Sequence, residues 1–207
     1  KILAFVINKD IIETYQNVLS DNNLSIEYFE LEIYSVLRSA IPKNVQNALV
    51  VDIGAKYAKF YSIKNGVVED AEKKLRGGIN FTQTIERTLQ IDNHKAETMK
   101  RNLDLSLIAE NTLGDNLTSE IEKIINSIEN FRKNSDLAES DPLYLAGGGS
   151  LLYGLPELLA KRLNMQVIIC QPFINVSAPE YLNKLLVETG PEYAVAAGLA
   201  LKHVMVV

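Results

Sequence analysis

The sequence predicts an α/β protein in which a mixed β-sheet is flanked by helices. Short apolar runs with the length of buried strands alternate with segments whose apolar residues recur at helical spacing. Two of the strand-like runs end in turns that contain glycine, one at Asp52-Ile53-Gly54 and the other at Gly147-Gly148-Gly149. Because strand ends of this kind meet at one edge of an α/β sheet, we expect the two turns to form the two sides of one cleft.

Periodicity predicts two strand-and-helix pairs in the N-terminal part of the chain. A buried strand at residues 2–7 is followed by a helix with Asp10 as its N-cap and apolar residues along one face. A second short strand at 26–29 precedes one or two helical turns at 33–37. The loop at 42–44 contains a proline, so we expect a boundary between two lobes there.

The rest of the chain predicts a β-meander followed by helices and further strands. Asn65-Gly66 is typical of a hairpin turn, and strand-like runs lie on both sides of it. The expected strands are 49–53, 58–63, 67–68, 143–146 and 167–169, and the expected helices are 82–89, 95–99, 119–131, 155–163 and 193–201. Strands and helices in this order build a protein of two or more layers.

Composition restricts the partners and the compartment. The 207 residues carry a formal net charge of −5, which argues against nucleic acid or an anionic membrane surface as a main partner. Cys170 is the single cysteine, so an internal disulfide is impossible and a reducing, cytoplasmic setting is expected. No apolar run is long enough to predict a transmembrane helix. Any membrane association is therefore expected to come through partners.

The two glycine-containing turns suit a phosphate ligand that carries a metal ion. Asp52 presents a carboxylate that can hold Mg²⁺ through water, and Gly54 lets backbone N–H groups approach a phosphate. The three glycines at 147–149 leave a surface without side chains, on which a base or a ribose can lie. Each motif taken singly is equally typical of an ordinary turn, so the prediction depends on their combination.

Further motifs accompany these two. In chain order the set comprises Glu32 in the short helix before the linker, Asp52-Ile53-Gly54, Gly77-Gly78 with Thr82, Ala96-Glu97 with Lys100, Gly147-Gly148-Gly149 with Leu155-Pro156, and the small residues at 194–200. This set resembles the actin-like ATPases, in the branch of the cell-division protein FtsA and the type IV pilus assembly protein PilM. The short span from Lys100 to Leu143 favours PilM over FtsA. The resemblance implies an actin-like (ribonuclease H-like) ATPase lobe, preceded by the tail of another lobe or by an inserted subdomain.

The resemblance also implies ATP or ADP with Mg²⁺ as the ligand. It assigns Mg²⁺ binding through water to Asp52, the orientation of an attacking water molecule to Glu32, and contacts with ribose and base to Glu97 and Lys100. The other residues that it places at the nucleotide are Gly54, Ala55, Lys56, Gly78, Gly147, Gly148, Gly149 and Ser150. Simpler alternatives are an exposed helix charge for Glu32 and a solvated surface ion pair for Glu97 and Lys100.

The sequence departs from the family pattern in two places. Ala55, Lys56, Tyr57 and Ala58 stand where the family often has serine and threonine, so either Lys56 replaces them as a point charge or phosphate binding is weak. The family's first phosphate hairpin has no counterpart in these residues, and we expect it upstream of Lys1. The chain is therefore expected to hold only part of the nucleotide's contacts.

These motifs predict a division of the chain into three parts. Residues 1–43 are expected to be the end of a first lobe or inserted small subdomain, together with a hinge helix. Residues 44–190 are expected to form the second actin-like lobe, with a short helical insertion at about 101–140. Residues 191–207 are expected to form a C-terminal hinge helix that returns to the first lobe.

Several functions remain open at this point. The resemblance to PilM implies an ATP-binding cytoplasmic scaffold that docks the short N-terminal tail of an inner-membrane pilus protein, and so sits at the inner face of the plasma membrane. The alternative is an FtsA-like cell-division ATPase or a filament-forming nucleotide switch, with self-association and at most slow ATP hydrolysis. A sugar or acid kinase of the same superfamily is a third interpretation, and it requires a substrate pocket that the residues do not reveal.

Overall fold

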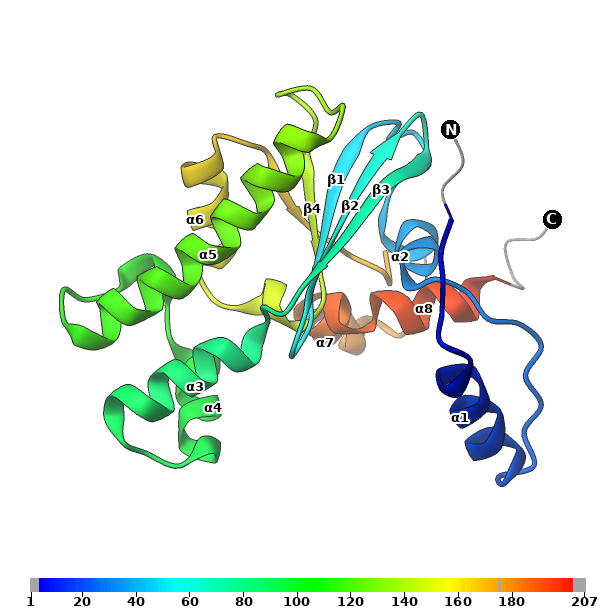
Figure 1. The fold of residues 1–207 in the computed structure, drawn as a ribbon, viewed down its shortest axis with the longest axis horizontal. Helices are drawn as coiled ribbons and strands as arrows, with labels where there is room; N and C mark the ends of the chain where they lie inside the picture. Colours follow the sequence, from blue (N-terminus) through cyan, green and yellow to red (C-terminus); the bar gives the residue numbers. More distant parts are fainter. Residues whose placement is uncertain (1–3, 175, 203–207) are drawn as a thin grey trace.

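A computed structural model describes residues 4–174 and 176–202. It shows one five-stranded sheet with helices on both faces, while one N-terminal helix stands apart (Figure 1). The strands are β1 (Ala48–Ile53), β2 (Ala58–Lys64), β3 (Val67–Lys74), β4 (Leu143–Ala146) and β5 (Val167–Ile169). The helices are α1 (Lys9–Ser20), α2 (Glu32–Ala40), α3 (Gly78–Leu89), α4 (Asn93–Asn102), α5 (Thr112–Asn134), α6 (Leu155–Leu163), α7 (Asn183–Thr189) and α8 (Ala194–Leu201). The described residues also form the 3₁₀ helices η1 (Leu105–Leu107), η2 (Gly148–Leu151), η3 (Glu180–Leu182) and η4 (Gly190–Tyr193).

The sheet is mixed, as predicted. Its strand order is β3-β2-β1-β4-β5, in which β1 pairs antiparallel with β2 and parallel with β4. The strand β2 pairs antiparallel with β3, and β4 pairs parallel with β5. In the β1–β4 pair Asp52 lies beside Ala146, so the turns that follow the two strands leave the sheet at the same edge. This register places the two glycine-containing motifs side by side.

Alternation along β1 divides the core between the two faces of the sheet. Leu49, Val51 and Ile53 belong to the larger core, which α3, α5 and α6 cover on one side. Ala48 and Val50 belong to the smaller core on the other side, beneath α2 and α8 (Figure 1). Since successive side chains of a strand point to opposite faces, the side chain of Asp52 points to the face that carries α2.

The long helix α5 shows why the larger core is well formed. Its apolar residues recur at three- and four-residue intervals, so one face is apolar along the whole helix, and that face is buried against the sheet. The Phe131 ring near its end packs on the Phe60 ring of β2, with 5.9 Å between the ring centroids. The helix extends beyond the predicted 119–131 at both ends. It begins earlier because Asn111 caps its start by accepting a hydrogen bond from the Gly114 N–H.

The helices α2 and α8 cross directly on the smaller core. Arg38 of α2 donates a hydrogen bond to the Gly198 carbonyl of α8 at 2.8 Å, and Ser39 donates to the Ala194 carbonyl at 2.7 Å. Arg38 also forms an ion pair with Glu30, and this pairing is the main reason why the pKa of Glu30 falls to about 2. The division into residues 1–43, 44–190 and 191–207 stays a prediction, but the helices from its first and last parts pack against each other.

Two strand predictions in the N-terminal part are wrong. Residues 4–7 and 26–29 have no regular structure, while Ile2 and Leu3 lie outside the described residues. Val6 is 96% exposed and α1 has no buried residue, so this segment has no sheet to join within the described part of the chain. An apolar run becomes a strand only where another strand supplies backbone partners. The cap of α1 is also corrected, because the Asn8 side chain accepts from the Asp10 N–H.

Most other elements agree with the prediction to within a few residues. The chief difference among the strands is β3, which continues to Lys74 rather than ending at residue 68 because β2 pairs with it along its whole length. The chief omission is α7, whose residues are all at least partly exposed and which therefore lacks a strong apolar pattern.

Candidate functional site

Two neighbouring pockets open at the edge of the sheet where β1 and β4 end. The first has a volume of about 200 Å³ and is lined by Glu32, Val36, Asp52, Gly54, Lys59, Ala146, Gly147, Gly148, Pro191, Glu192, Ala194 and Val195. The second has a volume of about 460 Å³ and is lined by Gly54, Ala55, Gly78, Glu97, Lys100, Arg101, Gly148, Gly149, Leu151, Leu152, Glu188, Thr189 and Glu192. Gly54, Gly148 and Glu192 line both pockets, so the two form a continuous candidate cleft.

Asp52 and Glu32 line the first pocket together with Lys59. The Lys59 ammonium lies 3.5 Å from an Asp52 carboxylate oxygen and forms a close ion pair with Glu32, the first residue of α2. Burial raises the pKa of Asp52, and the positive charge of Lys59 partly opposes that rise. Burial by itself lowers the pKa of Lys59, but its bonds to the two carboxylates outweigh burial and raise it. The pocket therefore holds an ionised lysine between two carboxyl groups.

Glu97 and Lys100 line the second pocket from the adjacent helix α4. The Glu97 carboxylate accepts hydrogen bonds from Lys100 at 2.6 Å, from Thr82 at 2.7 Å and from Arg101 at 3.0 Å. Lys100 also reaches the Gly78 carbonyl at 3.4 Å. Burial tends to raise the pKa of Glu97, but the three hydrogen bonds lower it to about 2. The prediction that these two residues share one face of a helix is confirmed, and Thr82 of α3 joins them.

The pKa of Glu97 predicts how Glu97→Gln changes stability with pH. Because this pKa is lowered from 4.5 to about 2, the ionised group stabilises the folded state above pH 4.5, and this contribution is lost as the pH falls through 2. The stability lost in Glu97→Gln should therefore shrink at acid pH. The effect should be small, because about a third of the side chain is exposed. Urea denaturation of both proteins over a pH series tests this, and an equal difference at every pH would contradict it.

The glycine turn after β4 packs directly on the Asp52 carboxylate. Gly147 has a φ of +78°, a conformation that glycine adopts without a side-chain clash. A Cβ atom at this position would overlap the Asp52 carboxylate and lie 2.6 Å from the Ile53 carbonyl oxygen. The Gly147 N–H donates to the Pro191 carbonyl at 3.0 Å, which holds η4 and its Glu192 against the turn. Gly147 therefore matters because it allows the turn to pack closely on β1. Gly148 and Gly149, which follow it, line the wall of the cleft.

The loop after β1 is docked on the start of α3. The carbonyl groups of Gly54 and Ala55 accept hydrogen bonds from the N–H groups of Gly78 at 3.0 Å and Ile79 at 2.9 Å. These N–H groups would otherwise be unpaired at the helix start, where they are suited to binding an anion. Since the loop already uses them, the first turn of α3 offers fewer donors to a phosphate than a free helix start would.

Ten of the twelve predicted site residues line the cleft, and two do not. Among the described lining residues Lys56 and Ser150 are missing. Lys56 is exposed, and the buried Ser150 hydroxyl donates inward to the Gly147 carbonyl at 2.7 Å. Both remain predicted ligands without a position in the cleft.

Sequence reasoning missed four charged residues of the cleft: Lys59, Arg101, Glu188 and Glu192. A signal for Lys59 was present, because pairing the predicted strands 49–53 and 58–63 outward from the short loop between them places Lys59 opposite Asp52, as the structure has it. Glu188 lies in α7 and Glu192 in the 3₁₀ helix η4 that follows it, and the sequence predicted neither element, so no local pattern indicated these residues.

The carboxylates fit a metal ion that arrives with phosphate. Among the described residues no group of three or more His, Cys, Asp or Glu side chains is placed to hold a metal ion. Mg²⁺ is commonly bound by one or two carboxylates together with substrate phosphates and water, and Asp52 with Glu32 offers that number of carboxylates. Such an ion would supply positive charge to the phosphates, while Asp52 would hold it through water.

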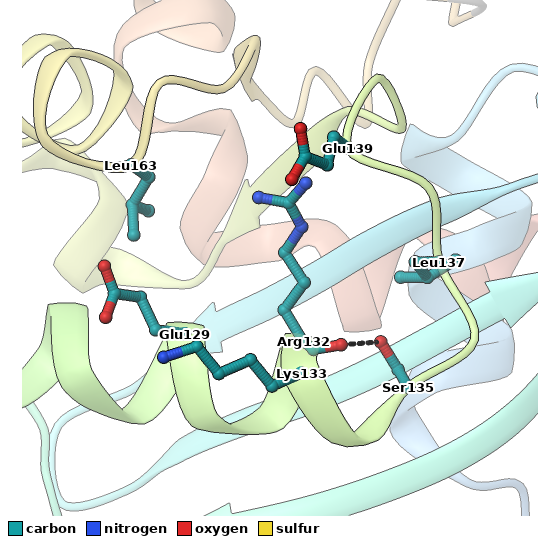
Figure 2. A pocket seen from close by; sticks show the side chains of 7 residues that line it. All are labelled: Glu129, Arg132, Lys133, Ser135, Leu137, Glu139 and Leu163. Carbon is teal, nitrogen blue, oxygen red and sulfur yellow. Dashed lines mark hydrogen bonds between the residues drawn. The ribbon is translucent and has the colours of Figure 1, made fainter.

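A third pocket of about 340 Å³ lies at the end of α5, away from the cleft. It is lined by Glu129, Arg132, Lys133, Ser135, Leu137, Glu139 and Leu163, and Figure 2 shows the Arg132 side chain extending toward Glu139. The Ser135 hydroxyl donates to the Arg132 carbonyl at 2.8 Å, which closes the last turn of the helix. This pocket is lined by charged side chains of both signs and by the end of a helix, and none of its lining residues is a predicted site residue. We therefore do not assign it a ligand.

Across residues 4–174 and 176–202, no helix is both long and apolar enough to cross a membrane.

Known structures that resemble the chain share its fold. The chain is 26% identical to a protein in a structure described as the PilM-PilN type IV pilus biogenesis complex, with a TM-score of 0.76 over 95% of this chain and 58% of that one. EutJ, the ethanolamine utilization protein of Carboxydothermus hydrogenoformans, is 20% identical, with a TM-score of 0.70 over 95% of this chain and 62% of its own. MreB5 of Spiroplasma citri, bound to AMPPNP, is 14% identical, with a TM-score of 0.75 over 96% of this chain and 66% of its own.

These structures are actin-like, so the predicted actin-like fold is confirmed, although the chain spans less than two thirds of the length of each. The comparison with curated proteins found no match. Residues 1–204 match the family described as type IV pilus assembly protein PilM. With the mixed sheet, the order of the motifs and this match in agreement, the chain belongs to the PilM family of the actin-like ATPases.

Proposed function

We propose that the cleft binds ATP or ADP with Mg²⁺ and that the nucleotide-bound protein serves as a docking scaffold in type IV pilus assembly. The observation that carries the proposal is the pair of connected pockets at the ends of the parallel strands β1 and β4. Ligands of α/β proteins commonly bind outside the carboxyl ends of strands. The relative MreB5 of Spiroplasma citri was solved with AMPPNP and with ADP, which supports a nucleotide as the ligand of this fold.

The charges of the cleft suggest an orientation for the nucleotide. The phosphates would lie in the first pocket beside Asp52, where Mg²⁺ offsets the repulsion between phosphate and carboxylate. The ribose and base would lie in the second pocket, where Glu97 accepts hydroxyl hydrogen bonds and Gly148 and Gly149 leave a flat wall. Glu97 is already held by three donors, so its acceptor oxygens are fixed in direction before a ligand arrives.

Replacing Lys100 tests the proposed nucleotide site. In Lys100→Met the affinity for Mg-ATP should fall roughly tenfold, because the cleft loses a cation and Glu97 loses a partner that orients it. The measurement is a titration of the chain with Mg-ATP, followed by backbone NMR shifts because they also detect weak binding. Lys95→Met is the matched control, since Lys95 lies on the same helix but is exposed and outside both pockets. Equal affinities of the two variants, or no shift in the wild type, would contradict the proposed site.

The proposed partner is the short N-terminal tail of an inner-membrane pilus protein of the PilN kind. The related PilM structure is described as a complex with PilN, and the family match makes a pilus protein a better candidate partner than a cell-division protein. Such docking would place this protein at the cytoplasmic face of the inner membrane. A synthetic peptide of the tail should bind in calorimetry, and a scrambled peptide of equal composition should not. Equal heats from both peptides would argue against tail docking.

The proposed output is docking rather than turnover. Ala55 and Ala58 stand where serine and threonine would bind phosphate in a hydrolytic relative, and the loop carbonyls occupy the first donors of α3. Self-association into filaments and an FtsA-like role in cell division are the competing outcomes. Rapid phosphate release or ATP-dependent filament formation would favour them.

A further inference from the structure

Lys59 is the residue of β2 that lines the first pocket, and its ammonium group lies between two carboxyl groups. In the β1–β2 pair Lys59 lies directly opposite Asp52, and both side chains are on the face of the sheet that carries α2. The helix α2 begins with Glu32, which forms an ion pair with the same ammonium group. Lys59 is thus enclosed by strand β1 on one side and helix α2 on the other, and 23% of its side chain is exposed.

The charges around Lys59 explain why it stays protonated. Its two partners carry one negative charge each when ionised, so the ammonium group leaves the trio with a net charge of −1. In a partly buried setting the attraction between opposite charges is stronger than in water, and each carboxylate favours the ammonium form. A mobile cation competing for these carboxylates would have to displace an ammonium group that is covalently attached to the neighbouring strand.

This arrangement limits what Glu32 can do chemically. A carboxylate that orients or deprotonates water needs a free lone pair within hydrogen-bond reach of that water. In Glu32 the Oε2 oxygen accepts a hydrogen bond from Lys59, and this ion pair turns the carboxylate toward Lys59. Glu32, to which the family resemblance assigns the attacking water, is therefore paired with Lys59 in this protein.

We propose that Lys59 is a resident cation of the cleft, which restrains Glu32 and excludes a bare divalent ion from the space between Glu32 and Asp52. A metal ion then enters only together with the phosphates of a nucleotide, and bound ATP is retained because the ion pair holds Glu32 toward Lys59 rather than toward an attacking water molecule. The part of this proposal that concerns ATP rests on the proposed nucleotide site, whereas the exclusion of a bare ion concerns the chain alone.

The first test uses Mn²⁺ and no nucleotide. Binding is followed by water-proton relaxation in the wild type, in Lys59→Met, which removes the charge at similar length, and in Lys59→Arg, which keeps it. Lys59→Met should bind Mn²⁺ roughly tenfold more tightly than the wild type, since two carboxylates lose their shared cation. Lys59→Arg should resemble the wild type. Lys64→Met is the matched control, because Lys64 ends the same strand but pairs with Asp136 away from the cleft.

The second test locates the gained ion and measures hydrolysis. Adding Asp52→Asn to Lys59→Met should remove the gained Mn²⁺ affinity, and phosphate release from Mg-ATP should be roughly tenfold faster in Lys59→Met than in the wild type. If Mg-ATP binds neither protein but Mn²⁺ binding changes as expected, the proposed nucleotide site is contradicted, while the proposal that Lys59 is a resident cation is supported. If folded Lys59→Met gains no Mn²⁺ affinity, the resident-cation proposal is overturned whatever ATP does.

Folding of the variants is checked by circular dichroism. Lys59→Gln serves as a second neutral variant, because its amide can still donate a hydrogen bond to a carboxylate. If either neutral variant is folded, its Mn²⁺ affinity decides the proposal. If both unfold while Lys59→Arg folds, Lys59 acts as a structural counter-charge for Asp52, and the proposal is overturned.

Discussion

Gly198→Ala is expected to destabilise the protein by about 3 kcal/mol, a large part of the stability of a typical domain. A Cβ atom at Gly198 would overlap the Ser35 carbonyl of α2 and lie 2.7 Å from the Ser35 Cα atom. The obstacle is the backbone of another helix, which cannot turn away as a flexible side chain could. The helices α2 and α8 would have to separate, and Arg38 would lose its bond to the Gly198 carbonyl.

The sign of the stability change in Gly198→Ala distinguishes a packing clash, which destabilises the protein, from helix propensity, which stabilises it. Alanine favours a helix interior over glycine by about 1 kcal/mol, so propensity alone predicts a more stable variant. Urea denaturation measures the sign directly. Ala196→Ser is the control, because Ala196 is exposed on the same helix and its change should cost a few tenths of a kcal/mol. A Gly198→Ala protein as stable as the wild type would show that the α2–α8 crossing is looser than described.

Asp52→Asn is expected to lower the affinity for Mg-ATP roughly 10–100-fold while leaving the protein folded and more stable. The affinity should fall because an amide does not attract the hydrated metal ion as a carboxylate does. The stability should rise because burial raises the pKa of Asp52, so its ionised form costs folding free energy near neutral pH. Lys59 keeps Glu32 as a partner in this variant.

The pH dependence of Asp52→Asn gives a second check. The unfolded chain has the ordinary pKa of 3.8 at this residue, and the folded protein a higher one, so the wild type loses stability as the pH rises from 3.8 through the folded pKa. The advantage of the variant should therefore vanish at low pH, where wild-type Asp52 is neutral. Asp115→Asn removes the same charge from the exposed first turn of α5, and should leave the nucleotide affinity unchanged. A less stable Asp52→Asn protein would contradict the expected cost of the buried charge.

The core strands and amphipathic helices were predictable because their signals are local. Every residue of β1 is buried, and such a strand is an uninterrupted apolar run in sequence until Asp52. The helix α6 has the predicted bounds, since glycine and proline mark its start and Asn164 in the left-handed conformation ends it. Residues 4–7 and 26–29 also look like strands in sequence, but they have no neighbouring strand among the residues that the structure describes, so the same kind of local signal gave a wrong prediction there.

Most residues of the candidate site were predicted, but the contacts that pair them across different elements were not. Glycine turns and the Glu97–Lys100 spacing are visible in the sequence because each depends on residues close together in the chain. The contact of Thr82 with Glu97 depends on the packing of α3 on α4, and that of Glu32 with Lys59 depends on the packing of α2 on the sheet. Ser150 shows the converse, because a motif placed it at the nucleotide while the turn directs its hydroxyl inward.

The sequence by itself determined the α/β class, the order of the principal elements and the edge of the sheet where the residues of the candidate site gather. Periodicity and glycine placement are properties of short segments, and they act before any long-range contact forms. Only the tertiary structure decided that Lys59 lies between Asp52 and Glu32, that η4 brings Glu192 to the glycine turn, and that α2 and α8 cross at Gly198. Each of these depends on two segments far apart in the chain, whose relative position is set by burial of their shared core.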